Sequence, residues 1–160
     1  MRTAVEWLDD YGDSHRNRTN KVLHWICVPV IVWCVLGLLW LLPFPGVRAT
    51  HPAANWAVVL VLAAMGYYAT LSIRLALGVL PVLLLFLWSI SRLDHPGMPL
   101  WRICVLLFVL AWLGQFIGHA IEGKRPSFLK DLQFLMIGPL WLFADGYRRL
   151  GINWRSGPRE

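Results

Sequence analysis

Four long apolar runs constrain this chain more than any other feature of its sequence. They occupy residues 24–42, 56–71, 75–90 and 100–121, and turn-forming or charged residues separate them. A helix needs about 20 apolar residues to cross the ~30 Å hydrocarbon core of a bilayer. The first and last runs have that length, and the middle two are slightly shorter. The pattern predicts an all-α, polytopic membrane bundle with about four spans.

Composition supports this class. Hydrophobic residues make up 58% of the chain and charged residues 15%, whereas ordinary domains have about 45–50% and 25%. The net charge of +6 comes from basic residues that flank the apolar runs, which is typical of contact with lipid headgroups rather than nucleic acid. The three cysteines lie in apolar runs, which favours buried thiols over disulfides. We expect one membrane domain over residues 1–160 and no nucleic-acid partner.

A polar head precedes the first span. It comprises residues 1–22, and it contains a few apolar side chains, Val5, Trp7 and Leu8. These residues predict a short helix that lies at the membrane interface.

After the last span, residues 123–160 form a basic turn, an amphipathic stretch and a basic tail. The stretch runs from Phe128 to Phe143 and contains the dipeptide Gly138-Pro139, which is a strong breaker of helices. Several polar residues lie within it. We therefore expect a re-entrant or interfacial hairpin rather than a further span.

The distribution of lysine and arginine sets the expected orientation. With four spans, the head, the turn at Arg74 and everything after the fourth span share one side. Twelve of the 15 basic residues lie there: Arg2, Arg16, Arg18, Lys21, Arg74, Lys124, Arg125, Lys130, Arg148, Arg149, Arg155 and Arg159. The other side has Arg48, Arg92 and Arg102. We expect an integral protein of a bacterial inner membrane, with both termini in the cytoplasm.

The same orientation divides the histidines into two groups. His51 and His95 fall in the outer loops, each followed by proline, as is typical of solvated loop residues. His15, His24 and His119 fall on the cytoplasmic side, where His24 opens the first span and His119 closes the fourth. Topology thus brings three histidines from distant parts of the chain to one membrane level.

Polar side chains accompany these histidines at helical spacing. Asn20 precedes His24 by four residues, Gln115 precedes His119 by four, and Glu122 follows His119 by three. Polar groups near the bilayer are costly, so such a cluster indicates function. Asn, Gln and Glu can also hold the rings of metal-bound histidines. The alternative is that these residues only cap and bridge helices at the interface.

Three imidazoles without a cysteine suit zinc or iron. Octahedral iron with three histidine ligands keeps three open positions, enough for a chelating substrate and O₂. A site beside the membrane favours a lipid substrate. Lys124 and Arg125 lie one helical turn beyond His119 and could hold a carboxylate headgroup. An anchor on the positive side of the membrane explains these two cations equally well.

Two ordered motifs resemble a known family. The head has the pattern Tyr11-xxx-His15-x-Asn17-xx-Asn20-xxx-His24, and the fourth span ends with Gln115-xx-Gly118-His119-xx-Glu122, later followed by Gly138-Pro139. Together these motifs resemble the Mpo1-like family of 2-hydroxy fatty acid dioxygenases over nearly the whole chain. The resemblance implies an Fe(II)-dependent α-oxidation, in which a 2-hydroxy fatty acid and O₂ give a fatty acid one carbon shorter, with loss of CO₂. It implies no organic cofactor.

The resemblance also implies residue roles. The iron ligands would be His15, His24 and His119. The polar residues Asn20, Gln115 and Glu122 would act in catalysis or lie beside the iron ligands. The substrate contacts would be Tyr11, Asn17, Lys124 and Arg125. The chain departs from the family at Cys27, where glycine is usual, and at Asp145, where glutamate is usual.

Two other functions fit the same residues. His24 and His119, on different helices at one membrane level, could be axial ligands of haem in a membrane electron carrier. The protein could also be a non-enzymatic lipid-binding protein with structural histidines. The third histidine and its Asn, Gln and Glu neighbours favour the dioxygenase over the haem carrier.

Overall fold

The computed structural model describes residues 2–45, 54–126 and 133–154. Within these ranges the chain is helical and contains no strand, so the predicted all-α class is confirmed. The helices, in chain order, are α1 (Ala4–Asp13), α2 (Arg18–Leu41), α3 (Trp56–Leu71), α4 (Ile73–Leu93), α5 (Leu100–Glu122) and α6 (Phe134–Arg149).

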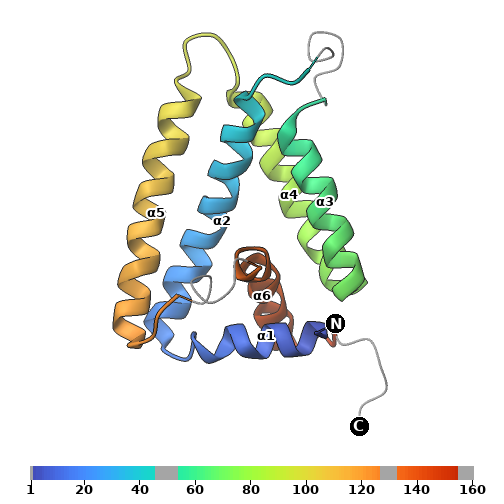
Figure 1. The fold of residues 1–160 in the computed structure, drawn as a ribbon, viewed down its shortest axis with the longest axis vertical. Helices are drawn as coiled ribbons and strands as arrows, with labels where there is room; N and C mark the ends of the chain where they lie inside the picture. Colours follow the sequence, from blue (N-terminus) through green and yellow to red (C-terminus); the bar gives the residue numbers. More distant parts are fainter. Residues whose placement is uncertain (1, 46–53, 127–132, 155–160) are drawn as a thin grey trace.

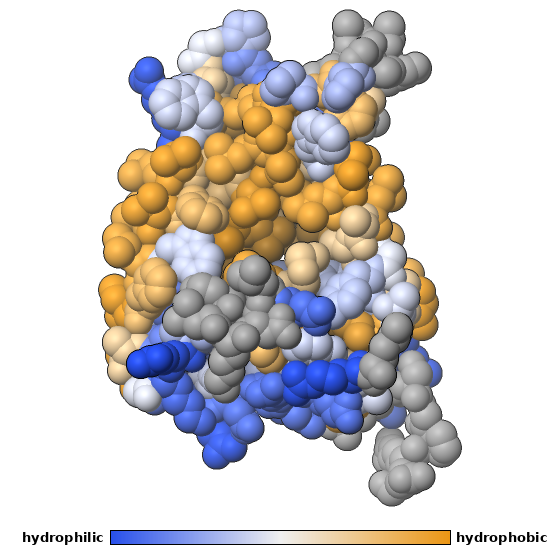
Figure 2. All heavy atoms as spheres, viewed as in Figure 1, coloured by the Kyte–Doolittle hydropathy of each residue, from blue (hydrophilic) through white to orange (hydrophobic). Residues whose placement is uncertain are grey.

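Three of the helices are long and apolar enough to cross a membrane. These are α2, α4 and α5, with 24, 21 and 23 residues. The fourth expected span, α3, is apolar but has only 16 residues. Large apolar side chains point outward, among them Leu62, Trp88 and Leu106, which are 67%, 62% and 61% exposed. Figure 2 shows an apolar band around the middle of the molecule, with most of the hydrophilic residues at its lower end and a smaller group at its upper end. An outer surface of this kind suits lipid.

Helices α2 to α5 run alternately up and down the bundle (Figure 1). The indole N–H of Trp56 donates to the Pro43 carbonyl at 3.1 Å, so α3 begins beside the end of α2. At the opposite end of α3, Ser72 Oγ and Arg74 Nη1 donate to the carbonyls of Trp154 and Asn153. The turn between α3 and α4 therefore lies against the tail, as the expected four-span topology requires.

Small residues bring α2 and α5 close together, and this is the most extensive helix interface in the bundle. A Cβ atom added to Gly37, Gly114 or Gly118 would lie 2.6, 2.7 or 2.5 Å from an atom of the other helix. The atoms that they meet are Cys104 Sγ, Cys27 Sγ and Asn20 Oδ1, respectively. Close backbone approach at small residues is a common way for membrane helices to associate. It sets the spacing between His24 on α2 and His119 on α5.

The first long helix begins earlier than the apolar run indicated. Its N-cap is Asn17, whose side chain accepts from Thr19 N at 2.8 Å. His24 therefore lies in the second turn of α2 and does not open the helix as predicted. Hydropathy alone missed the polar first turn because the capped helix extends beyond its apolar part.

The break predicted at Gly138-Pro139 is wrong, since α6 passes through Pro139 as one helix. Pro139 lies near the start of α6 and costs one backbone hydrogen bond there. Burial offsets that loss, because Ile137, Leu140 and Trp141 are all at most 2% exposed. Figure 1 shows α6 among the other helices, with α1 across the same end of the bundle.

Two sequence predictions concern residues that the structure does not describe. The start of the predicted hairpin at Phe128 and the loop residue His51 lie outside the described residues. His95 is exposed in the turn after α4, as expected of a loop histidine.

Candidate metal centre

Three histidines meet at the end of the bundle where α1 crosses it. His15 lies between α1 and α2, His24 on α2, and His119 in the last turn of α5. They are 1%, 1% and 5% exposed. One ring nitrogen from each lies within 4.8 Å of the other two, an arrangement able to hold a metal ion. The predicted convergence of these three residues is therefore present in the structure.

Backbone carbonyls fix the tautomers of two of the rings. Nδ1 of His15 donates to the Tyr11 carbonyl at 2.6 Å, and Nδ1 of His24 donates to the Asn20 carbonyl at 3.0 Å. Burial, followed by the nearby His24, lowers the pKa of His15 to about 3, so its ring is neutral at pH 7. In the neutral ring a protonated Nδ1 leaves Nε2 with a free lone pair.

The two Nε2 atoms of His15 and His24 lie only 2.9 Å apart. With both protons on Nδ1, two lone pairs face each other, and a cation between them removes the repulsion. Two nitrogens bound at ~2.0–2.1 Å to one ion at a right angle would be about 2.9 Å apart. The donor set and its geometry therefore fit a divalent metal held by His15, His24 and His119.

Glu122 joins the end of α5 to the loop that carries His15. Its carboxylate accepts from the backbone N–H groups of Arg16 and Asn17 at 2.9 and 2.8 Å, and from Asn20 Nδ2 at 3.0 Å. Asn20 Nδ2 also donates to the Ser14 carbonyl at 3.1 Å. Asn20 and Glu122, predicted to accompany different histidines, thus bind each other and hold the segment between α1 and α2 against α5, which positions His15 relative to His119.

Gln115 is buried one turn before His119 and lines a small cavity with His24 and His119. The cavity has a volume of about 60 Å³, and Tyr11 contributes to its wall. Nε2 of Gln115 has no hydrogen-bond partner among the described residues. A buried amide donor left without a partner costs free energy, which indicates that a polar ligand belongs in this cavity.

A larger apolar cavity adjoins the small one. It has a volume of about 300 Å³ and lies between α2, α3, α4, α5 and α6. Five residues line both cavities, namely Ile31, Val32, Trp112, Leu135 and Pro139. The histidine cluster therefore lies beside two adjoining cavities that together extend into the bundle.

The other predicted substrate contacts lie away from this space. Asn17 caps α2 and donates its backbone N–H to Glu122. Lys124 Nζ donates to the Asp13 carbonyl at 2.6 Å, which ties the end of α5 to α1. With Arg125, Lys124 lines a second, open hollow that reaches the other side of His119. Of the four predicted substrate contacts, Tyr11 alone lines the small cavity, together with Gln115, which was predicted to act in catalysis.

Sequence reasoning missed the part that α6 plays in the site. Phe134, Gly138 and Pro139 line the small cavity, and the Trp141 ring lies 5.2 Å from that of His15. Tyr11 stacks on His15 at 4.2 Å, with an angle of 11° between the rings. A Cβ on Gly138 would lie 3.0 Å from the Tyr11 hydroxyl. The Gly-Pro dipeptide was therefore a signal of close packing on α1 and not of a break.

The two departures from the family pattern have structural roles here. Asp145 Oδ2 accepts from Trp25 Nε1 at 3.3 Å and from Arg149 Nε at 2.8 Å, so this carboxylate joins α6 to α2. Cys27 packs its Sγ against Gly114 on α5. Neither residue lines the small cavity.

Comparison with known proteins gives two findings. The family model described as "2-hydroxy-palmitic acid dioxygenase Mpo1-like" matches residues 1–150. The 2-hydroxy-palmitic acid dioxygenase MPO1 of Saccharomyces cerevisiae is 28% identical over 146 residues, which cover 88% of this chain and 78% of the yeast protein. No solved structure matches the chain. With the family model covering almost its full length, the chain belongs to the Mpo1-like family.

Proposed function

We propose that this protein is an Fe(II)-dependent membrane dioxygenase that converts 2-hydroxy fatty acids to fatty acids one carbon shorter. The observation that carries the proposal is a cluster of three buried imidazoles, two of which line a small cavity that adjoins a larger apolar cavity. The yeast relative is named as a dioxygenase of a 2-hydroxy fatty acid. This substrate combines a metal-chelating head with a hydrocarbon tail, which matches the two parts of the space.

The overall reaction needs no further reductant. A 2-hydroxy acid, R–CH(OH)–COOH, and O₂ give R–COOH, CO₂ and H₂O. The bond between C1 and C2 breaks, C1 leaves as CO₂, C2 becomes the new carboxyl carbon, and O₂ is reduced. Zinc has no redox chemistry, so the donor set of His15, His24 and His119 is assigned to iron. When bound, iron would supply the redox chemistry and a Lewis acid at the substrate oxygens.

The protein's own groups orient and enclose the head of the substrate. Nε2 of Gln115 donates a hydrogen bond to a substrate oxygen in the small cavity, which gives this buried donor its partner. Asn20 and Glu122 hold the loop of His15 in place. Tyr11, stacked on His15, and α6 cover the site and exclude water.

Two basic side chains help the fatty acid to enter the site. Lys124 and Arg125 line the open hollow that reaches His119, and their charges attract the carboxylate from the membrane surface. The positive bias of the head and tail supports a cytoplasmic position for this surface. The substrate would then enter from membrane lipid at the cytoplasmic leaflet, with O₂ as the second substrate.

Metal content and O₂ consumption test the proposal together. Protein purified without air should contain about one iron per chain and should consume O₂ with 2-hydroxypalmitate. The His119→Ala variant should lose both properties, because it removes one of three ligands. The matched control is His95→Ala, since His95 is an exposed histidine in the turn after α4; it should keep iron and activity. Turnover retained in His119→Ala would refute the ligand assignment.

The same preparation separates the rival functions. A Soret band would support haem, which would have to occupy the adjoining apolar cavity as well as the small cavity of about 60 Å³ beside His24 and His119. Absence of stoichiometric iron, together with retained fatty acid binding, would support a non-enzymatic lipid-binding protein.

A further inference from the structure

We propose that the apolar cavity between helices α2 to α6 binds the acyl chain of the substrate, and that its far end sets the longest chain accepted. The identity of the ligand rests on the function proposed above. The cavity itself is an observation independent of that function.

The lining of this cavity suits a hydrocarbon chain and little else. The described residues that line it have apolar or aromatic side chains, and none of them is charged. Tyr68 supplies a hydroxyl, and that hydroxyl donates to the Met136 carbonyl at 2.7 Å. Water in such a space would find few partners, so an apolar ligand gains the free energy of burial.

The cavity also extends along the helices away from the histidines, as an acyl chain would if its head group lay at the metal site. Along α2 its lining continues from the histidine level through Val28, Ile31, Val32 and Val35 to Leu36. Along α5 it continues in the opposite sense from His119 through Gln115 and Trp112 to Phe108. Both helices thus present one continuous wall, and its polar end is the site where the head of the substrate would lie.

The length of this wall corresponds to a long-chain acid. From His24 to Leu36, a rise of 1.5 Å per residue gives roughly 18 Å. An extended hydrocarbon with bonds of about 1.52 Å advances ~1.25 Å per carbon, so roughly 14 carbons fit beyond the head.

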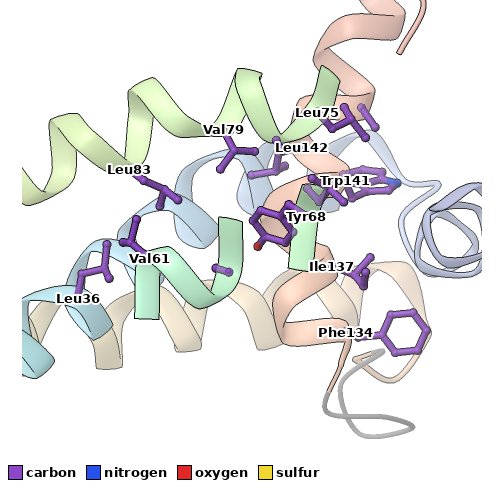
Figure 3. Close-up of a cluster of buried hydrophobic side chains, with 14 of the residues drawn as sticks. Leu36, Val61, Tyr68, Leu75, Val79, Leu83, Phe134, Ile137, Trp141 and Leu142 are labelled. Atoms are coloured by element: carbon purple, nitrogen blue, oxygen red, sulfur yellow. The ribbon is translucent and has the colours of Figure 1, made fainter. Parts of the chain in front are cut away.

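Side chains from three helices close the far end. Figure 3 shows Leu36, Val61 and Leu83 gathered at one end of the buried cluster, with Phe134 at the other. These three residues are 2%, 5% and 6% exposed, respectively. Ala64 lies about one turn from Val61 on α3, where its small side chain leaves room in the cavity.

A substitution that fills the cavity tests the inference. Ala64→Phe should remove about one helical turn, or 5.4 Å, of the space, which is equivalent to about four carbons. We expect kcat/KM for 2-hydroxypalmitate to fall at least about tenfold, while that for the 2-hydroxy acid of ten carbons stays within about twofold. The control is Ala63→Phe, the same change at a neighbouring residue that is exposed on the outer surface of α3. It should leave the preference for chain length unchanged.

A second variant covers the possibility that Ala64→Phe fails to fold. Leu83→Ala enlarges the far end, so the preference should shift to longer acids. An equal fall for all chain lengths in Ala64→Phe, or no shift in either variant, would overturn the inference even in an active enzyme.

Binding without turnover separates this inference from the proposed reaction. In nanodiscs, saturated fatty acids of 8 to 18 carbons that lack the 2-hydroxyl should raise the melting temperature in proportion to their affinity. Ala64→Phe should lose this shift for the longer acids and keep it for the shorter ones. That result in a protein without dioxygenase activity would support the cavity and refute the reaction. A shift independent of chain length would refute the cavity.

Discussion

The Nε2 atoms of His15 and His24 are held 2.9 Å apart by contacts on the far sides of their rings. Each Nδ1 is fixed by a backbone carbonyl four residues earlier, at Tyr11 for His15 and at Asn20 for His24. The orientations of these two rings are therefore set in part by the local backbone. A site organised in this way is preorganised, and metal binding costs little rearrangement.

Gln115 leads to a prediction at this scale, because its amide Nε2 is buried beside the histidines and has no partner in the part of the chain that the structure describes. Gln115→Leu keeps the approximate shape and removes the donor. A lost hydrogen bond to a charged group corresponds to about 1.5–3 kcal/mol, so we expect kcat/KM to fall about 10- to 100-fold.

Iron content is the control for this variant. It should stay at the wild-type value, because Gln115 orients the substrate and is not a ligand. Loss of iron in parallel with activity would assign Gln115 to the metal instead, and unchanged kinetics would remove it from the site.

At the scale of elements, the close packing of α2 and α5 at their glycines leads to a second prediction. In Gly114→Ala the new Cβ would lie 2.7 Å from Cys27 Sγ, so the helices must separate or the cysteine must move. We expect a loss of about 1–3 kcal/mol in stability, as for other overpacked interiors, and weaker iron binding because His24 and His119 move apart.

A double mutant tests the cause of that loss. Adding Cys27→Ala removes the clashing sulfur and should restore part of the stability, which is a coupling expected of residues in contact. Gly66→Ala on α3 is the matched control, since a Cβ there meets nothing within 4 Å. It should not be destabilising. Equal effects of Gly114→Ala and Gly66→Ala in thermal unfolding would refute the packing argument.

The elements also show what sequence could and could not predict. Apolar runs located α2 to α5, and the spacing of Asn20, Gln115 and Glu122 placed polar groups beside the histidines. The start of α2 was missed because Asn17 caps a polar turn that hydropathy does not detect. The continuous α6 was missed because the cost of Pro139 is local, whereas the burial that offsets it comes from α1, α2 and α4.

At the scale of the whole molecule, the orientation in the membrane follows from charge. The head, the turn at Ser72 and the tail lie at one end of the bundle, and that end carries most of the lysines and arginines. The positive-inside rule predicts that this end is cytoplasmic.

Reporter fusions in a bacterial host check this prediction. Alkaline phosphatase, which is active only after export, should be inactive when fused after Glu160 and active when inserted in the turn at His95. Green fluorescent protein should give the opposite pattern. Active phosphatase at the C-terminus would reverse the orientation, and equal activity at both positions would contradict a topology that separates them.

The bonds from Glu122 to the segment around Asn20 join residues that are 102 positions apart in the chain. During synthesis the first two imidazoles leave the ribosome long before the third exists. A nascent chain arrested ahead of its final hydrophobic segment therefore has an incomplete coordination sphere. Capture of the metal proposed for this site would then be a late event in biogenesis, after synthesis of α5.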